Sequence, residues 1–186
     1  MALVDRVGEA LSKIPGGVTL TTVDTLVDWS RGQSLWPFPM GTACCAIELI
    51  AASFNKFDFD RLGTFPRPDP RHTDVMILAG TITEKMKPAV QRLYDQMPDP
   101  KWVIAMGNCT VSGGIFYYDT YSVVRGADTF LPVDVYISGC PPRPEALQDG
   151  VLQLRELVKT ESLAPGTRHK REMTLPCCRE QDGDEG

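Results

Sequence analysis

The segment DVMILAG (residues 74–80) is a short apolar run that ends in glycine, and the pattern recurs in KWVIAMG (101–107) and PVDVYISG (132–139). Short apolar runs closed by glycine are typical of strands buried in a parallel sheet. TEKMKPAVQRLYDQMP (83–98) and RPEALQDGVLQLRELVKT (143–160) have the apolar spacing of amphipathic helices. This alternation predicts an α/β domain with a mostly parallel sheet and flanking helices.

The residues that precede these strands are less regular. LTTVDTLVDWSRG (20–32) predicts a helix that ends at its glycine, and CCAIELIAAS (44–53) predicts a second one. Between these two helices, SLWPFPMGTA (34–43) predicts an extended segment broken by prolines. FNKFDFDRLGTFPRPDPRH (54–72) predicts a loop, because its alternating prolines exclude both a helix and an interior strand.

The chain length and composition are those of one globular domain: 186 residues, 42% hydrophobic and 23% charged. We expect an amphipathic N-terminal segment at 1–19, the α/β domain at 20–160 and a flexible polar tail at 161–186. The net charge of −5 argues against nucleic acid as a partner.

Membrane insertion is not expected from the sequence. Charged Asp5, Arg6 and Glu9 interrupt the first apolar residues, so we expect no signal peptide. No run approaches the ~20 apolar residues that a membrane-spanning helix needs. Any membrane contact should therefore be peripheral or made through partners.

Four of the six cysteines are expected at one edge of the sheet. Cys109 lies two residues past one predicted strand, Cys140 directly follows another, and the tandem pair Cys44–Cys45 ends the extended segment. Open α/β sheets bind their ligands at the carboxyl ends of the strands. Adjacent side chains point apart in a regular helix or strand, so a ligand held by the tandem pair should require irregular backbone. The remaining Cys177–Cys178 pair falls in the polar tail, where we expect no ligand role.

Cysteines in a chain without an export signal are metal ligands or catalytic groups more often than disulfides. Four thiolates suit zinc or a 4Fe–4S cluster. Structural zinc usually takes compact Cys-x₂₋₄-Cys pairs, which favours the wider iron–sulfur cube for thiols on separate loops. At this level the alternative that the cysteines only fill the core stays open.

Five segments together resemble one protein family closely; they are SLWPFPMGTACCAIELIAAS, DRLGTFPRPDPRHTDVMILAGTIT, QMPDPKWVIAMGNCTVSGG, YSVVRGAD and PVDVYISGCPPRPEAL. This family is the small iron–sulfur subunit of NADH:quinone oxidoreductase (respiratory complex I). The resemblance covers about residues 20 to 160. It implies a flavodoxin-like open sheet that carries one 4Fe–4S cluster, the terminal one of the complex, on Cys44, Cys45, Cys109 and Cys140.

The resemblance also implies a function in a proton-translocating complex. The cluster would pass electrons to a quinone in a cavity shared with a large partner subunit. A ferredoxin-like iron–sulfur subunit and membrane-arm subunits would be further partners, and the location would be peripheral, on the cytoplasmic face of the bacterial cell membrane. Candidates to line the quinone cavity are Trp36, Met40, Ile50 and Arg67. Candidates to tune the cluster are Arg67, Arg71 and Thr42.

The chain departs from the family pattern in the proline-rich loop, where PRPDPRH (66–72) stands in place of the frequent FRASPRQ. Asp69 and His72 are among the altered residues. In addition, Thr42 occupies a position that is usually apolar, where its hydroxyl would donate toward a cluster sulfur or face away.

Two other functions compete with this prediction. The small subunit of a related membrane-bound hydrogenase-type complex would share the fold, but those relatives typically separate the first two cysteines by two residues. A zinc-stabilised binding module is the second alternative. No NADH site is expected, because no Gly-x-Gly-x-x-Gly opens a helix.

Overall fold

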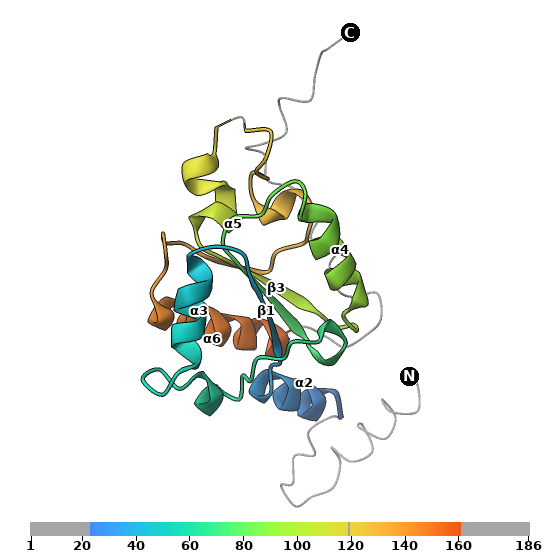
Figure 1. Cartoon of the computed structure of the whole chain (residues 1–186). Coiled ribbons are helices and arrows are strands. Elements are labelled where there is room, and N and C mark those ends of the chain that lie inside the picture. The colour runs from blue at the N-terminus through green and yellow to red at the C-terminus, as the bar shows by residue number, and fades with distance from the viewer. Residues whose placement is uncertain (1–22, 119, 161–186) are drawn as a thin grey trace, which may run out of the picture.

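Four parallel strands form the centre of the protein in a computed structural model that describes residues 23–118 and 120–160 (Figure 1). The strands pair in the order β1-β2-β3-β4. Their bounds are β1 Pro37–Gly41, β2 Val75–Ala79, β3 Trp102–Met106 and β4 Val135–Ile137. The predicted α/β class with a parallel sheet is confirmed. The expected N-terminal helix at 1–19, the tail at 161–186 and its cysteine pair lie outside the described residues.

The helices connect the strands and flank the sheet. The α-helices are α2 Val23–Gln33, α3 Cys45–Ser53, α4 Lys87–Gln96, α5 Asn108–Ser112 and α6 Pro144–Thr160. The short 3₁₀ helices are η1 Phe59–Leu62, η2 Pro70–His72, η3 Gly114–Phe116 and η4 Ala127–Thr129. The helix predicted at 83–98 is shorter than expected, because Pro88 stands in the first turn and fixes its start.

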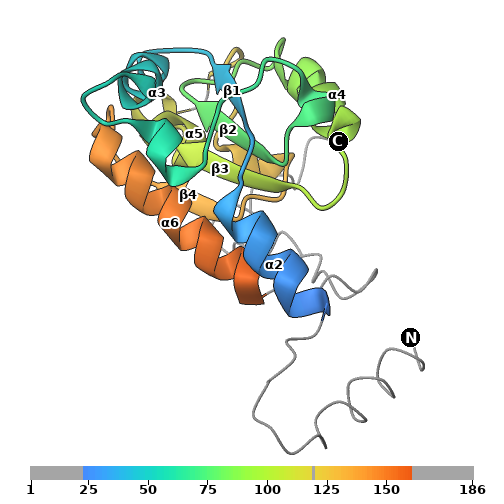
Figure 2. The same cartoon turned by 90° about the horizontal axis from the view of Figure 1, so that it is seen from below.

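Helices lie on both sides of the sheet (Figure 2). Each face of the sheet has its own apolar core. On one face, alternate residues of β2 and β3 pack with α3 and α6, whose Leu147, Val151 and Leu154 are buried. On the other face, the remaining strand residues pack with Val90 of α4 and with the segment 124–133. Because both faces are covered, β2 and β3 are apolar at every position, as their sequences predicted.

The strand β1 corrects the sequence analysis, which expected only an extended approach at 34–43. Pro37 and Pro39 are tolerated because β1 is the edge strand, where a missing N–H costs no ladder hydrogen bond. The proline-rich loop runs beside this edge: Leu35 bridges Thr64, and Arg67 N donates to Pro37 O over 2.9 Å. The edge is thereby shielded from pairing with another chain.

Within the described residues no helix has the length and apolar character needed to span a membrane.

Candidate functional site

The four candidate cysteines follow the carboxyl ends of three strands. Cys44 and Cys45 follow β1, Cys109 follows β3 and Cys140 follows β4, so the segments that carry them meet at one edge of the sheet (Figure 1). Cys45 and Cys109 are buried, whereas Cys44 and Cys140 are exposed. Two buried thiols and two exposed thiols therefore lie along the same edge of the sheet.

The tandem pair begins a regular helix, which differs from the irregular backbone that we expected. Cys44 is the N-cap of α3 with helical dihedral angles of φ −56° and ψ −30°, and Cys45 is the first helical residue. The two side chains diverge, as adjacent helical residues must. Cys45 points into the core with 2% of its surface exposed, and Cys44 stays at the surface.

Unusual backbone is found instead beside Cys109. Gly107 has φ 94° and ψ 151°, a conformation that is essentially restricted to glycine. A Cβ atom on Gly107 would overlap with Cys45 Sγ. Gly107 therefore lets β3 end directly against the buried thiol of α3, which brings Cys45 to the segment that carries Cys109.

Asn108 joins the Cys109 segment to the Cys140 segment. Its backbone N–H donates to Gly139 O over 2.9 Å, and its side-chain Oδ1 accepts from Gly139 N over 2.8 Å. Gly107 N also donates to Ile137 O at 2.8 Å. The loops that follow β3 and β4 are thus held together by hydrogen bonds next to both cysteines.

Hydroxyl groups tie the same edge to the end of β2. Thr110 Oγ1 donates to Gly80 O over 2.7 Å and accepts from Gly80 N over 3.2 Å. Thr42 Oγ1 donates to Ala79 O over 3.3 Å. We considered that the Thr42 hydroxyl would donate toward a sulfur or face away. In the structure it donates to the backbone carbonyl of Ala79.

The electrostatics of the four thiols fit a cluster-binding site. Burial raises the pKa of the Cys45 thiol to about 11, and the neighbouring Cys44, Cys109 and Cys140 contribute to this rise. Thiolates gathered in this way repel one another, so they need a compensating positive charge to be deprotonated together. Iron supplies such a charge, since a coordinating thiol is deprotonated outright.

A single metal ion fits the described residues less well. No three of their His, Cys, Asp or Glu side chains form a group that could hold one ion. A cube of four irons takes its thiolates from wider spacing than a tetrahedral zinc ion does. The donor set is therefore compatible with a 4Fe–4S cluster.

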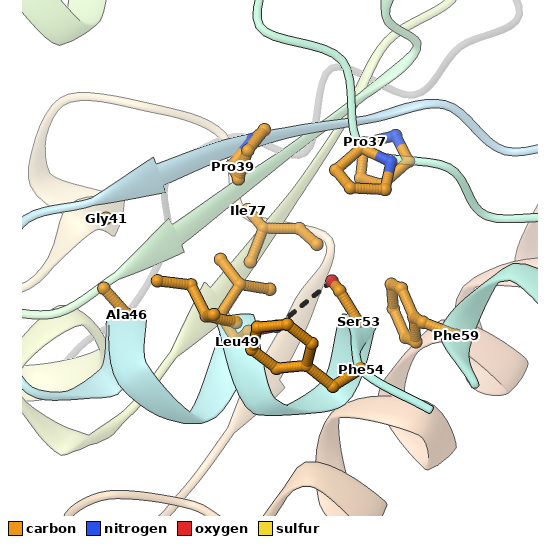
Figure 3. A pocket seen from close by; sticks show the side chains of 11 residues that line it. Pro37, Pro39, Gly41, Ala46, Leu49, Ser53, Phe54, Phe59 and Ile77 are labelled. Atoms are coloured by element: carbon orange, nitrogen blue, oxygen red, sulfur yellow. Dashed lines mark hydrogen bonds between the residues drawn. The ribbon is translucent and has the colours of Figure 1, made fainter. Parts of the chain in front are cut away.

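An apolar cavity of about 440 Å³ lies between β1 and α3 (Figure 3). Ala46, which follows the tandem pair, lines one end, and Pro37 and Phe59 line the other. Among the predicted quinone-cavity residues, Ile50 lines this cavity. Met40 packs against the core on the opposite face of the sheet instead.

Trp36, Arg67 and Arg71 lie at the amino-terminal edge of the sheet, and the structure does not bring them together with the cysteines. Trp36 precedes β1, and both arginines line a second cavity with it. Five residues of strand place that edge about 13 Å from the carboxyl edge. The effect that we expected from a guanidinium beside the cluster weakens over such a separation.

Residues 43–154 match the model of the family described as NADH ubiquinone oxidoreductase, 20 kDa subunit. The chain belongs to this family. The resemblance found in the sequence is therefore confirmed.

Relatives of the 20 kDa subunit family cover most of the chain. The B 2 subunit of the NADH-quinone oxidoreductase of Rhizobium etli (strain CIAT 652) is 54% identical over 86% of this chain and 95% of its own length. The K subunit of the NAD(P)H-quinone oxidoreductase of Gloeothece citriformis (strain PCC 7424) is 58% identical over 78% of this chain, but the match spans only 59% of that longer protein.

A solved structure shares the fold. A chain of the membrane-bound sulfane sulfur reductase, an archaeal respiratory membrane complex, superposes with a TM-score of 0.72 at 38% identity. The match covers 80% of this chain and 83% of that one. The fold of this chain therefore also occurs in a respiratory membrane complex that is described as a sulfane sulfur reductase.

In the cluster-free chain, we expect Cys44 and Cys140 to be alkylated by iodoacetamide before Cys45. The thiolate is the reacting form, and Cys45 is both buried and shifted to a pKa of about 11. Its labelling should rise as the pH is raised from about 8 towards that pKa, because deprotonation then becomes favourable. Peptide mass spectrometry measures each site, and equal labelling of Cys44 and Cys45 at the lower pH would contradict the shift.

Sequence reasoning missed the residues that hold the thiols in place. The position of Gly107 at the end of a predicted strand could have pointed to it. The reason that no side chain fits there is the thiol of Cys45, which lies on another element. Asn108 carried none, because its partner Gly139 lies on a distant loop.

Proposed function

We propose that this protein is the electron-transfer subunit of a proton-translocating NADH:quinone oxidoreductase. Cys44, Cys45, Cys109 and Cys140 would hold its single 4Fe–4S cluster, which when bound accepts and releases one electron at a time. The observation that carries the proposal is that the four cysteines follow the carboxyl ends of β1, β3 and β4 at one edge of the sheet.

Residues of this chain fix the spacing of the cysteine-bearing loops and keep water away from one side of the site. The hydrogen bonds between Asn108 and Gly139 fix the spacing of the two loops that bear Cys109 and Cys140. Burial of Cys45 and Cys109 excludes water from one side, and solvent access is one of the factors that set a cluster's reduction potential.

The test of this function uses the purified complex that contains this chain. We expect more iron and acid-labile sulfide than in the Cys45→Ala complex, in equal amounts. We also expect a 4Fe–4S signal in low-temperature EPR after dithionite reduction that the variant lacks and that decays when quinone is added. Zinc in place of iron, or a signal that persists in the presence of quinone, would overturn the proposal.

The apolar cavity between β1 and α3 is our candidate for this chain's half of the quinone site. Its end at Ala46 is next to the tandem cysteines, so a quinone head placed there would be within reach of the cluster. The side chains Ile47, Ile50 and Phe54 leave one face of α3 apolar and exposed. Such a face marks an interface, and we assign it to the large partner subunit.

Replacing Ile50 with alanine should weaken quinone binding without changing the cluster. Ile50 lines the cavity, and alanine there should lose about 1 kcal/mol of binding free energy from apolar contact with the quinone. This loss corresponds to a rise of roughly fivefold in the KM for quinone. Ile115→Ala is the matched control, because Ile115 is exposed on η3 and does not line the cavity. An unchanged KM in Ile50→Ala would remove this residue from the site.

The remaining partners follow from the same proposal. A ferredoxin-like iron–sulfur subunit would deliver electrons, and membrane-arm subunits would attach the chain peripherally to the cytoplasmic face of the bacterial cell membrane. The hydrogenase-type alternative is less well supported, because the tandem Cys44–Cys45 pair differs from the separated pair typical of those complexes.

A further inference from the structure

A cationic cavity of about 520 Å³ lies at the amino-terminal edge of the sheet, away from the cysteines. Its lining residues are Trp36, Arg67, Arg71, His72, Asp74 and Pro98. Two guanidinium groups on one open cavity are suited to an anion with several oxygen atoms, because arginine presents paired donors in a planar fork.

The Arg67 side chain is held by aromatic rings rather than by a carboxylate. Its guanidinium carbon lies 4.7 Å from the ring centre of Trp36 and 5.3 Å from that of Phe65. Its backbone N–H is anchored to Pro37 O. Neither Arg67 nor Arg71 forms an ion pair with any carboxylate of the described residues. Both guanidinium groups can therefore direct their donors to a ligand.

Two carboxylates lie near the arginines, and that of Asp74 is part of the cavity lining. Asp69 accepts from Arg71 N over 3.1 Å and pairs with His72 Nδ1 over 2.8 Å. Burial raises the pKa of Asp74, and Arg31 partly offsets this rise. The hydrogen bond from the Arg71 backbone lowers the pKa of Asp69 and the Arg71 guanidinium is among the further causes, so Asp69 offsets part of the charge of that guanidinium. No ion pair joins Arg67 to a carboxylate of the described residues.

The cationic cavity shares a wall with the apolar one. Trp36 and Arg67 line the cationic cavity. Their chain neighbours Pro37 and Pro66 line the apolar cavity. If the quinone head lies near Ala46, the lipid-soluble tail leaves at the end lined by Pro37 and Pro66. We therefore place that end towards the bilayer, with the cationic cavity beside it.

We propose that Arg67 and Arg71 bind the phosphate of an anionic phospholipid at this edge. The inference rests on the quinone half-site proposed above for its orientation toward the membrane. Trp36 and Phe65 are aromatic residues of the kind enriched at the level of lipid headgroups. The adjoining apolar cavity favours a lipid over free phosphate, since an amphiphile uses both surfaces.

The test uses the assembled complex in nanodiscs that contain a photoactivatable phosphatidylglycerol. Mass spectrometry should locate the label within residues 62–74, well above the labelling from a matched phosphatidylcholine probe. In the double variant Arg67→Gln and Arg71→Gln, labelling should fall by roughly thirtyfold, the effect of removing two cations near an anionic surface. Arg92→Gln on the exposed side of α4 is the control and should label like the wild type.

Three results would overturn the proposal. Equal labelling by both lipids, or labelling that stays unchanged in the double variant Arg67→Gln and Arg71→Gln, would exclude an anionic lipid held by these arginines. If the Gln variant fails to assemble, the variant Arg67→Lys and Arg71→Lys decides: an assembled complex without label would assign the arginines to a protein contact. EPR of the same samples reports the cluster, so failure of this lipid site is distinguished from failure of the proposed electron-transfer function.

Discussion

A complex that carries Cys45→Ala in this chain is expected to lose the EPR signal of its 4Fe–4S cluster and to reduce quinone only at background rates. Cys45 is buried beside Gly107 at the edge where Cys109 and Cys140 follow their strands, and alanine offers no ligand in its place. Alanine is smaller than cysteine and fits the same buried position, so the chain should still fold. Low-temperature EPR and quinone reduction, measured on one preparation, check both losses.

The double variant Cys177→Ala and Cys178→Ala provides the matched control. It removes the other adjacent cysteine pair of the sequence, which we predict to have no ligand role. It should therefore retain both the signal and the activity. A signal that survives Cys45→Ala would show that Cys45 only fills the core, and its assignment as a ligand would be withdrawn.

Gly107→Ala is expected to have the second largest effect, although it removes no ligand. A Cβ at this position is strained at φ 94° and ψ 151°, and it would overlap with Cys45 Sγ. The strain and the displaced helix should lower the free energy of unfolding by about 3 kcal/mol. Urea unfolding of the chain measures this loss, and the iron content of the complex should fall with it.

Gly32→Ala is the matched control for this substitution. Gly32 lies within α2, and a Cβ there would meet Lys159 Cγ at 3.5 Å, an ordinary contact. Because alanine favours helix over glycine, the free energy of unfolding should rise by up to about 1 kcal/mol. Equal destabilisation by both substitutions would contradict the special role of Gly107.

The interior of the sheet could be predicted from the sequence because the pattern there is local. Strands β2 and β3 are apolar at each position and end at a glycine, which is what burial on both faces requires. Strand β1 was missed as a strand, since Pro37 and Pro39 argue against a ladder unless the strand is known to be at an edge. That knowledge depends on the order of the strands, which no local pattern contains.

The same distinction applies to the candidate site. The common edge followed from the positions of Cys109 and Cys140 after predicted strands and of the tandem pair after a predicted extended segment. The placement of Arg67 did not, because the loop between α3 and β2 turns back along β1 to the start of that strand, where Pro37 O accepts from Arg67 N. A long-range bond of this kind has no signature in the spacing of residues.

The bond between Asn108 and Gly139 also has a consequence for biogenesis. It joins two loops whose strands, β3 and β4, are separated by a long connection, so it forms only after those strands have paired. The thiols of Cys109 and Cys140 reach their final spacing at that moment and not earlier. If these cysteines hold the proposed cluster, their spacing is completed only when β3 and β4 pair. We then expect chains that wait for iron and sulfide to keep the exposed Cys44 and Cys140 open to oxidation.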